Sequence, residues 1–303
     1  MNDTTLRIGI DAGGTLTKIA ARRPDGQFRF LKFPSADAGR IVAWLAAEAP
    51  GAALAFTGGK AGNLQALASD RMPADAAHMR AAVTVPEFDA TCAGARWLLG
   101  RDERNLDSFL LTNVGTGTSI HYVTPDGHER VGGTGVGGGT ILGLAALLGG
   151  IGAGLRSGGG DSAVAEAGLA EKLDYAGLVA LARKGDRARV DLKVSHIYAG
   201  VTPPIPGDLT ASNFGHVANQ TEPIGLADAL ASVIGLVGET VTTVSVHAAR
   251  ELGTADIVYI GSTFLGNTLL AEIVNRYTKL RGGRPYVLPD GEYSGAVGAL
   301  LAL

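Results

Sequence analysis

Short apolar segments separated by turn residues fill the start of the chain. Residues 6–10, 16–21 and 28–33 are predicted strands, because glycine, proline and aspartate interrupt the sequence between them. Residues 41–49 space their apolar side chains at helical intervals, and residues 53–56 read as a short buried strand. The pattern therefore predicts three strands in a meander, followed by a helix and a fourth strand.

A similar order begins again at residue 108. Residues 108–114 are an apolar strand, a Gly-Thr-Gly-Thr turn follows, and residues 119–123 are a second strand that leads into a turn at 125–127. Two β–turn–β units, each followed by β/α segments, predict a duplicated α/β fold with a cleft between its halves. We place the halves at residues 1–107 and 108–303.

The remaining pattern is mostly helical. After a glycine-rich segment, residues 141–148 form an apolar block that predicts a buried helix, and residues 256–260 and 286–288 are predicted strands. Further helices are predicted at 87–99, 163–173, 178–183, 190–198, 226–251, 268–280 and 294–303.

Composition and charge narrow the classes of function. Of 303 residues, 46% are hydrophobic and 18% charged, which is ample material for a packed core. The net charge is −3 and no lysine- or arginine-rich run is present, which argues against nucleic acid as a partner. Residues 131–155 carry no charge but are too rich in glycine for a membrane span. The single cysteine, Cys92, favours a reducing, cytoplasmic compartment, and the N-terminus does not have the pattern of a signal peptide.

Residues 11–18 (DAGGTLTK) have the composition of a phosphate-binding turn, because an aspartate ends the predicted strand and glycines and a threonine follow. Bare amides and the Thr15 hydroxyl can donate to phosphate oxygens, and the carboxylate of Asp11 can hold hydrated Mg²⁺. Lys18 can add a positive charge. An ordinary tight hairpin uses the same residue types, so this segment alone leaves both interpretations open.

Two further glycine–threonine segments fit the same chemistry. Residues 113–119 (NVGTGTS) form a second strand–turn–strand bend, although a common threonine-rich turn has the same composition. Residues 132–140 (GGTGVGGGT) precede the apolar helix, whose N-terminal amides form an anion site. A flexible linker would be richer in polar residues. Residues 257–264 end a buried strand in Gly-Ser-Thr, which suits a nucleoside site or, equally, a plain β–α turn.

Together these segments resemble a known family. The strings DAGGTLTK, VPEFDA, NVGTGTS, RVGGTGVGGG, PPIPGDLTASNFGH and YIGSTF are similar to those of type II pantothenate kinases, within the superfamily of actin, sugar kinases and heat-shock chaperone ATPases. The resemblance covers nearly the whole chain. It implies the duplicated RNase H-like fold of actin-type ATPases, with ATP and Mg²⁺ in the cleft between two subdomains. It also implies ATP-dependent phosphorylation of pantothenate to 4'-phosphopantothenate, the first step of coenzyme A biosynthesis, by a homodimer whose interface we expect at residues 226–251.

The resemblance assigns roles to individual residues. Glu87 matches the catalytic glutamate, although a glutamate after proline in a first helical turn is also favoured by the helix dipole alone. Asp11 matches a metal ligand that acts through water. The acceptor side is expected to contain Glu87, Thr116, Ser119 and Arg130, of which Arg130 is alternatively a solvated hairpin arginine. The nucleotide side is expected to contain Asp11, Gly13, Gly14, Thr15, Leu16, Thr17, Lys18, Thr116, Gly138, Gly139, Thr140, Ile141, Leu142, Tyr175 and Ser262.

Some features fall outside this interpretation. An extra glycine- and alanine-rich segment between Gly149 and Leu173 is absent from the shorter bacterial members of the family. The histidines at 121, 196, 216 and 247 share no metal-ligand spacing, so we expect core or surface histidines, and we expect Cys92 to be buried and inert. The alternatives to a pantothenate kinase are a sugar or amino-sugar kinase of the same fold and a non-catalytic nucleotide or acyl-coenzyme A sensor.

Overall fold

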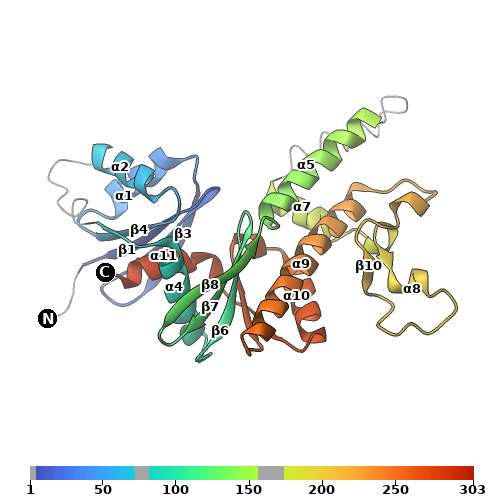
Figure 1. Cartoon of the computed structure of the whole chain (residues 1–303). Coiled ribbons are helices and arrows are strands. Elements are labelled where there is room, and N and C mark those ends of the chain that lie inside the picture. Colours follow the sequence, from blue (N-terminus) through green and yellow to red (C-terminus); the bar gives the residue numbers. More distant parts are fainter. Residues whose placement is uncertain (1–4, 72–81, 156–173) are drawn as a thin grey trace.

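The computed structural model describes residues 5–71, 82–155 and 174–303, with only the backbone for 150–155 (Figure 1). The first of its two large sheets has the strand order β3-β2-β1-β4-β5. Strand β1 pairs antiparallel with β2 and parallel with β4, so it lies at the centre. The strands are β1 (Arg7–Ala12), β2 (Leu16–Arg22), β3 (Phe28–Pro34), β4 (Ala53–Thr57) and β5 (Val83–Thr84).

The second sheet repeats this order as β8-β7-β6-β11-β12. Strand β6 pairs antiparallel with β7 and parallel with β11, as β1 does with β2 and β4. The predicted duplication is therefore confirmed in strand order and in strand direction. The strands are β6 (Phe109–Val114), β7 (Thr118–Thr124), β8 (Gly127–Thr134), β11 (Asp256–Ile260) and β12 (Arg284–Val287).

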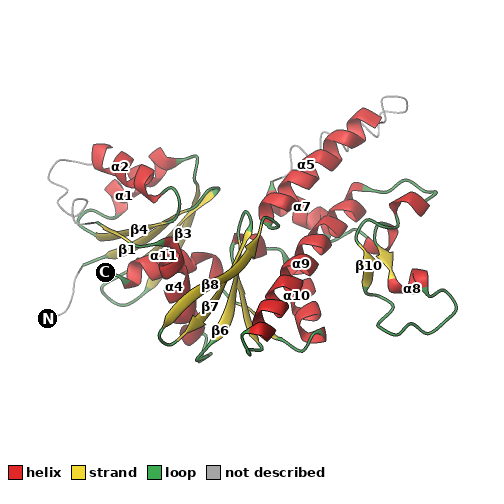
Figure 2. Cartoon of the chain, in the orientation of Figure 1, coloured by secondary structure: helices red, strands yellow, loops and turns green. Residues whose placement is uncertain are grey.

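Two helices, α4 (Glu87–Arg101) and α11 (Ser294–Leu301), lie between the sheets (Figure 2). A buried cluster joins Ala20 of the first sheet and Leu111 of the second to Leu98 of α4 and Val297 of α11. Helix α11 follows the second sheet in the sequence yet packs against β1 of the first. We propose that the division at residues 107 and 108 separates the two sheets, with α11 crossing back over it.

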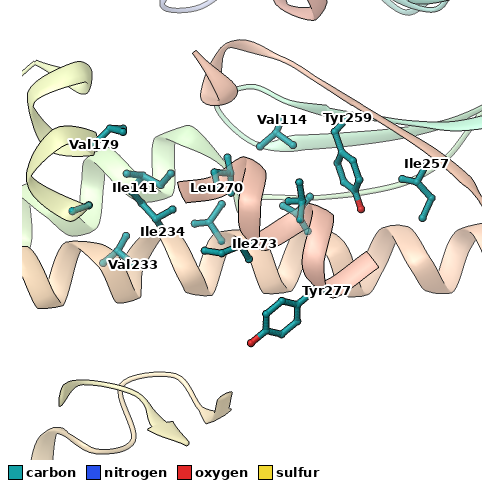
Figure 3. Close-up of a cluster of buried hydrophobic side chains, with 14 of the residues drawn as sticks. Val114, Ile141, Val179, Val233, Ile234, Ile257, Tyr259, Leu270, Ile273 and Tyr277 are labelled. Carbon is teal, nitrogen blue, oxygen red and sulfur yellow. The ribbon is translucent and has the colours of Figure 1, made fainter. Parts of the chain in front are cut away.

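The outer faces of the sheets are covered by separate sets of helices. Helices α1 (Ala38–Glu48) and α2 (Ala61–Arg71) cover the first sheet. In the second half, Ile141, Ile234 and Leu270 belong to one buried cluster with Tyr259 of β11 (Figure 3). The helices that contribute to this cluster are α5 (Gly138–Leu155), α7 (Tyr175–Ala182), α9 (Leu226–Glu251) and α10 (Thr268–Leu280).

Helix α9 is the central helix of the second half. Among the described residues it alone is long and apolar enough to cross a membrane, but 72% of its most apolar stretch is buried inside the fold. Its exposed side chains are His247, Arg250 and Glu251, all in its last turns. Because its apolar face packs against α5, α7 and α10, the expectation that this helix forms a subunit interface is not supported.

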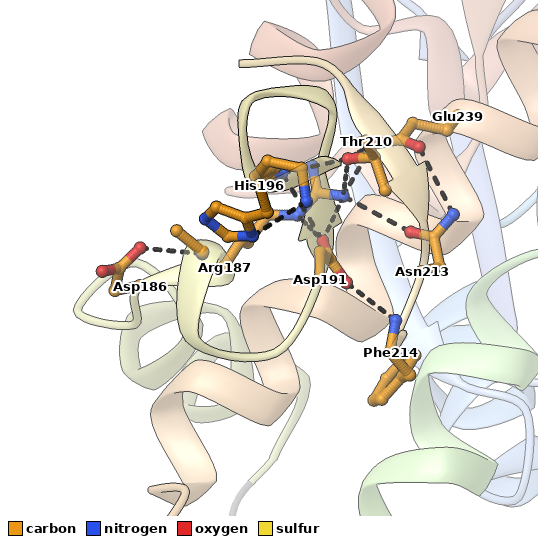
Figure 4. Close-up of polar contacts among 10 residues, drawn as sticks. Asp186, Arg187, Asp191, His196, Thr210, Asn213, Phe214 and Glu239 are labelled. Carbon is orange, nitrogen blue, oxygen red and sulfur yellow. Dashed lines mark hydrogen bonds and ion pairs between the residues drawn. The ribbon is translucent and has the colours of Figure 1, made fainter. Parts of the chain in front are cut away.

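A small lobe packs on α9 and contains η1 (Arg187–Arg189), β9 (Leu192–Lys193), α8 (Val194–Ile197) and β10 (Thr210–Ser212). The Arg187 guanidinium donates to Asp191 at 2.8 Å and to Glu239 of α9 at 2.6 Å (Figure 4). Burial alone would lower the pKa of Arg187, but these two carboxylates outweigh it and raise that pKa. The lobe is therefore bound to α9 through a buried ionic network.

Most predicted elements are present, and α9 and α10 begin and end where the sequence predicts. The prediction of a helix over 190–198 is wrong, because Leu192–Lys193 is a strand and only Val194–Ile197 is helical. Buried Asp191 accepts from Arg187 and from the Phe214 amide, and apolar spacing does not encode such tertiary contacts. Strand β8 includes the first three residues, 132–134, of the glycine-rich segment that precedes α5. The helix predicted over 163–173 and most of the extra segment lie outside the described residues.

Candidate active site

A cavity of about 790 Å³ lies between the two halves of the fold. Its wall contains the bend between β1 and β2, the bend between β6 and β7, and residues from the starts of α4, α5, α7 and α11. The predicted site residues in this wall are Asp11, Gly13, Gly14, Thr15, Leu16, Lys18, Glu87, Thr116, Gly138, Gly139, Leu142, Tyr175 and Ser262.

The bend between β1 and β2 faces the cavity with free backbone donors. The Gly13 amide donates to the Leu16 carbonyl at 3.2 Å, and Lys60 Nζ donates to the Gly14 carbonyl at 2.6 Å. Among the described residues, the amides of Gly14 and Thr15 donate to no protein atom. Adjacent free amides in a turn are the arrangement that binds phosphate oxygens.

The bend between β6 and β7 is fixed by the start of α5. The amides of Gly138 and Gly139 donate to the carbonyls of Gly115 and Thr116, at 2.8 and 2.9 Å. These two amides, which were expected to form an anion site at the helix N-terminus, are therefore already bonded. In the described part of the chain, the amides of Thr116 and Gly117 have no protein acceptor, so the free donors on this side belong to the bend itself.

Three carboxylates in the cavity wall, those of Asp11, Glu87 and Glu292, have pKa values raised chiefly by burial. Asp11 Oδ2 accepts from Lys18 Nζ at 3.3 Å, but burial raises the pKa of Asp11 more than Lys18 lowers it. Burial, and then the negative charge of Asp11, raises the pKa of Glu87, with Lys18 acting in the opposite direction. Glu87 is exposed to the cavity, and a glutamate with a raised pKa is a stronger proton acceptor than an ordinary one.

Tyr175, at the start of α7, lines the cavity beside the turn η3 (Ser262–Phe264) that follows β11. Its hydroxyl donates to the Thr263 carbonyl at 2.6 Å and accepts from Asn267 at 2.9 Å. Burial raises the pKa of Tyr175 to about 12. The Thr263 hydroxyl donates to the Gly115 carbonyl at 2.9 Å, so this turn is tied to the second bend.

Three residues predicted on the nucleotide side, Thr17, Thr140 and Ile141, are not in the cavity wall. Thr17 is buried, and its hydroxyl is 3.1 Å from that of Ser35. The Thr140 hydroxyl accepts from the Gly137 amide at 3.1 Å, and Ile141 is fully buried in the core. These side chains stabilise the segments that carry the site.

Two residues predicted on the acceptor side, Ser119 and Arg130, also lie outside the cavity wall. Ser119 Oγ is hydrogen-bonded to His121 Nε2 at 2.8 Å. Arg130 is exposed on β8, directly opposite His121 of β7, and its guanidinium lies over Gly133. Both residues therefore occupy the β7–β8 hairpin next to the cavity.

The cavity wall also contains residues that the sequence did not identify, namely Lys32, Thr91, Asn113, Glu292 and Gly295. Asn113 had a signal, because it opens the string NVGTGTS. The others come from β3, from α4, from the turn before α11 and from α11 itself, segments that the sequence analysis did not connect with the site. Only the tertiary fold brings them to the site.

Cys92 is buried, as predicted, but two histidines that are distant from it in the sequence lie close to it in the fold. One ligand atom each from Cys92, His121 and His128 lie within 4.8 Å of one another. Burial raises the pKa of the Cys92 thiol to about 12. Burial, His128 and Arg130 lower the pKa of His121 to about 4. None of the three residues is in the cavity wall, and they join α4 to the β7–β8 hairpin.

Comparisons with solved structures show the fold. The (R)-2-hydroxyglutaryl-CoA dehydratase component A of Acidaminococcus fermentans superposes with a TM-score of 0.58 and 14% identity, over 98% of this chain and 97% of that one. A glucokinase from Balamuthia mandrillaris, solved in complex with glucose, gives a TM-score of 0.57 and 11% identity, over 98% of this chain and 93% of that one. The chain has the actin-like ATPase fold.

Sequence comparisons find relatives that are much more similar to this chain than those solved structures are. The type II pantothenate kinase of Staphylococcus haemolyticus is 40% identical over 296 residues, which cover 97% of this chain and 99% of that protein. The type II pantothenate kinase of Bacillus cereus strain AH820 is 41% identical over 295 residues, which cover 97% of this chain and 96% of that protein. The family model named Fumble matches residues 21–302. The chain therefore belongs to the Fumble family, together with the type II pantothenate kinases.

Proposed function

We propose that this protein transfers the γ-phosphoryl group of ATP to the primary hydroxyl of pantothenate, the first step of coenzyme A biosynthesis. The observation that carries the proposal is that both bends, Asp11 and Glu87 line one cavity. Phosphoryl transfer needs little covalent chemistry from a protein, because it depends on positioning and on stabilising charge. Family membership supports pantothenate as the acceptor.

The two bends are the proposed binding site for the phosphates of ATP. Their free amides, at Gly14 and Thr15 on one side and Thr116 and Gly117 on the other, supply donors from both halves of the fold. Lys18 adds a positive charge in the same wall. Because each donor is fixed in a backbone bend, little reorganisation is needed when the charge of the phosphoryl group shifts during transfer.

Mg²⁺ is the proposed metal cofactor, and the residues present fit it. Mg²⁺ is usually held by one or two carboxylates, by substrate phosphates and by several retained waters. Asp11 offers a buried carboxylate in the cavity wall, with a single side-chain cation beside it. We assign Asp11 to this role through water. Bound Mg²⁺ would neutralise charge on the phosphates and would lower the pKa of Asp11.

Glu87 is the proposed general base for the pantothenate hydroxyl. Its carboxylate is in the cavity wall at the first turn of α4, and its raised pKa favours proton uptake. Thr116 is within the same wall, and we propose that Ser119 and Arg130, on the adjacent hairpin, hold the rest of the acceptor. The guanidinium of Arg130 offers a fork of donors for carboxylate or phosphoryl oxygens.

The nucleoside is proposed to bind beside Tyr175 and Ser262, where α7 and the turn after β11 meet at the cavity. The hydrogen bond from Tyr175 to Thr263 fixes the tyrosine ring at this position. A turn at the carboxyl end of a parallel strand is a common place for nucleotides in α/β folds.

A cytoplasmic homodimer, with no nucleic acid or membrane partner, is part of the proposal. Exposed apolar side chains support a subunit contact on α5 and the small lobe rather than on α9. Leu147 of α5 is 59% exposed, and Val201 and Ile205 of the lobe are 70% and 51% exposed. Sedimentation of the purified protein at micromolar concentration measures the oligomeric state directly.

A coupled assay for ADP release, with MgATP and pantothenate, tests the proposed activity. We expect turnover with pantothenate that is lost in Glu87→Gln, while nucleotide binding is retained. A panel of hexoses and amino sugars in the same assay tests the sugar-kinase alternative. Nucleotide binding without turnover on any acceptor would instead support a sensor and would refute the proposal.

A further inference from the structure

Cys92, His121 and His128 form a compact group outside the cavity wall. They come from three elements, since Cys92 is on α4, His121 on β7 and His128 on β8. Cys92 and His121 are 2% and 1% exposed, and the His128 side chain is 21% exposed. Their ligand atoms all lie within 4.8 Å of one another. Ligand atoms around tetrahedral Zn²⁺ are about 3.3–3.6 Å apart, so a small contraction completes the site.

Each imidazole presents an unused nitrogen. His121 Nε2 is hydrogen-bonded to Ser119 Oγ and His128 Nε2 to Asp89 Oδ1, both at 2.8 Å. The Nδ1 atoms of both rings are buried and have no hydrogen-bond partner. When Nε2 carries the proton that these acceptors take, Nδ1 holds a free lone pair, which is the tautomer that binds a metal.

The partners of the two rings have the character of an outer shell around a metal. Metal-ligating histidines usually donate their second ring nitrogen to a carboxylate or another oxygen, and this bond fixes the ring orientation. Asp89 would accept this hydrogen bond from His128, and Ser119 would accept it from His121. The β7–β8 pairing contains a bulge between Gly132 and Arg130, beside His121. Such bulges re-aim side chains locally.

We propose that Cys92, His121 and His128 bind a divalent transition-metal ion, with Zn²⁺ as the best match. A thiolate and two imidazoles are a ligand set that Zn²⁺ favours, and water can supply the fourth ligand on the side of His128, whose side chain is 21% exposed. Binding forms one metal–sulfur and two metal–nitrogen bonds and releases the thiol proton of Cys92 to solvent. No change in oxidation state is involved.

The metal would join α4 to the β7–β8 hairpin at one point. Helix α4 carries Glu87 and the hairpin carries Ser119 and Arg130, so the proposed base and the proposed acceptor contacts would be held together. The site therefore acts on the geometry of the proposed active site and contributes no atom to the reaction. Its occupancy can be measured without ATP or pantothenate.

Metal content of the full chain tests the proposal. Protein stripped with chelator, supplied with ZnSO₄ and desalted should retain about one zinc per chain by mass spectrometry. Cys92→Ser and His128→Gln should each retain at most a tenth of the zinc that wild-type protein retains, with an unchanged circular dichroism spectrum. His216→Gln is the matched control. The Nδ1 atom of His216 is also buried without a hydrogen-bond partner, but His216 does not belong to the group around Cys92.

Two further measurements locate the ion. With Co²⁺ in place of Zn²⁺, a thiolate charge-transfer band is expected in the wild-type protein and should be absent from Cys92→Ser, since Cys92 is the only cysteine. Asp11→Asn should keep its zinc, because Asp11 is not part of this group. Wild-type protein that retains less than a tenth of an equivalent, or equal zinc in all variants, would overturn the proposal and leave the proposed kinase activity untouched.

Discussion

Gly94 of α4 lies in close contact with α11, and this contact allows a specific prediction about the site. A Cβ added at Gly94 would lie 1.9 Å from the Ser294 carbonyl oxygen, whereas real Cβ contacts are at least 3.0 Å. In Gly94→Ala the two helices must therefore separate by about 1 Å. Backbone cannot rotate away as a flexible side chain can, so we expect a loss of about 1–3 kcal/mol in the free energy of unfolding.

The same displacement should also change the geometry of the proposed active site. Helix α4 begins at Glu87, and the start of α11 packs on Asp11, because a Cβ at Gly295 would be 2.9 Å from Asp11 Oδ2. Separating α4 from α11 therefore changes the distance between the proposed base and the proposed metal ligand. A misplacement of about 1 Å can reduce a rate by about 10²-fold. We expect the loss in kcat to exceed any change in KM for ATP.

Gly100→Ala is the matched control. Gly100 is on the same helix, and a Cβ there would meet nothing within 4 Å. Replacing a helical glycine by alanine at an open position should stabilise the protein by up to about 0.5–1 kcal/mol and leave kcat unchanged. Urea unfolding and steady-state kinetics measure both effects. If Gly94→Ala and Gly100→Ala unfold at the same urea concentration with equal kcat, the reasoning about the helix crossing is refuted.

Three further predictions concern single polar side chains. Arg187→Leu removes the guanidinium from Glu239 and leaves Asp191 only the longer ion pair to Lys193 Nζ at 3.8 Å, so urea unfolding should show a loss of about 3–5 kcal/mol, and adding Glu239→Gln should recover part of it. Because the pKa of Glu87 is raised above 4.5, kcat/KM should fall as the pH is lowered through this raised pKa, where the proposed base becomes protonated. A raised pKa also means that the ionised form of Glu87 destabilises the fold at higher pH, so Glu87→Gln should have a higher Tm than wild type at pH 8. Tyr175→Phe removes the bond to the Thr263 carbonyl and should raise KM for ATP more than KM for pantothenate; equal changes in both would contradict the nucleoside assignment.

The sequence predicts the parts of the site that local composition encodes. Residues 11–18 and 113–119 combine glycine, hydroxyl and polar residues at strand ends, and the structure places both bends on one cavity. Glu87 is recognisable because it follows a proline at a helix start within a family string. The exact bounds of α9 follow from an uninterrupted apolar period between two glycines, at 225 and 253.

Contacts between distant segments are what the sequence does not reveal. The bonds from Gly138 and Gly139 to the second bend could not be predicted, because a helix N-terminus looks the same whether its amides are free or bonded. The group around Cys92 has no ligand spacing along the chain, since its members belong to a helix and two strands that meet only in the folded protein. Where one helix was predicted, the chain forms a strand and a short helix, and Asp191 beside them accepts from the Phe214 amide, which is 23 positions away in the sequence.

The duplicated sheets explain how one architecture supplies two different surfaces to the cavity. Asp11 is the second-last residue of β1 and pairs with Lys18 across the hairpin; Asn113 is the second-last residue of β6 and pairs with Ser119. The duplicated fold therefore offers the same two positions twice, and both Asp11 and Asn113 reach the cavity. The first pair is charged, which suits a metal ion and phosphates, and the second is neutral, which suits hydrogen bonding to an uncharged hydroxyl. We therefore propose that divergence at these equivalent positions, rather than any difference in fold between the halves, places the metal ligand on the Asp11 side and hydrogen-bonding groups for the acceptor on the Asn113 side, while the free amides of both bends bind phosphate.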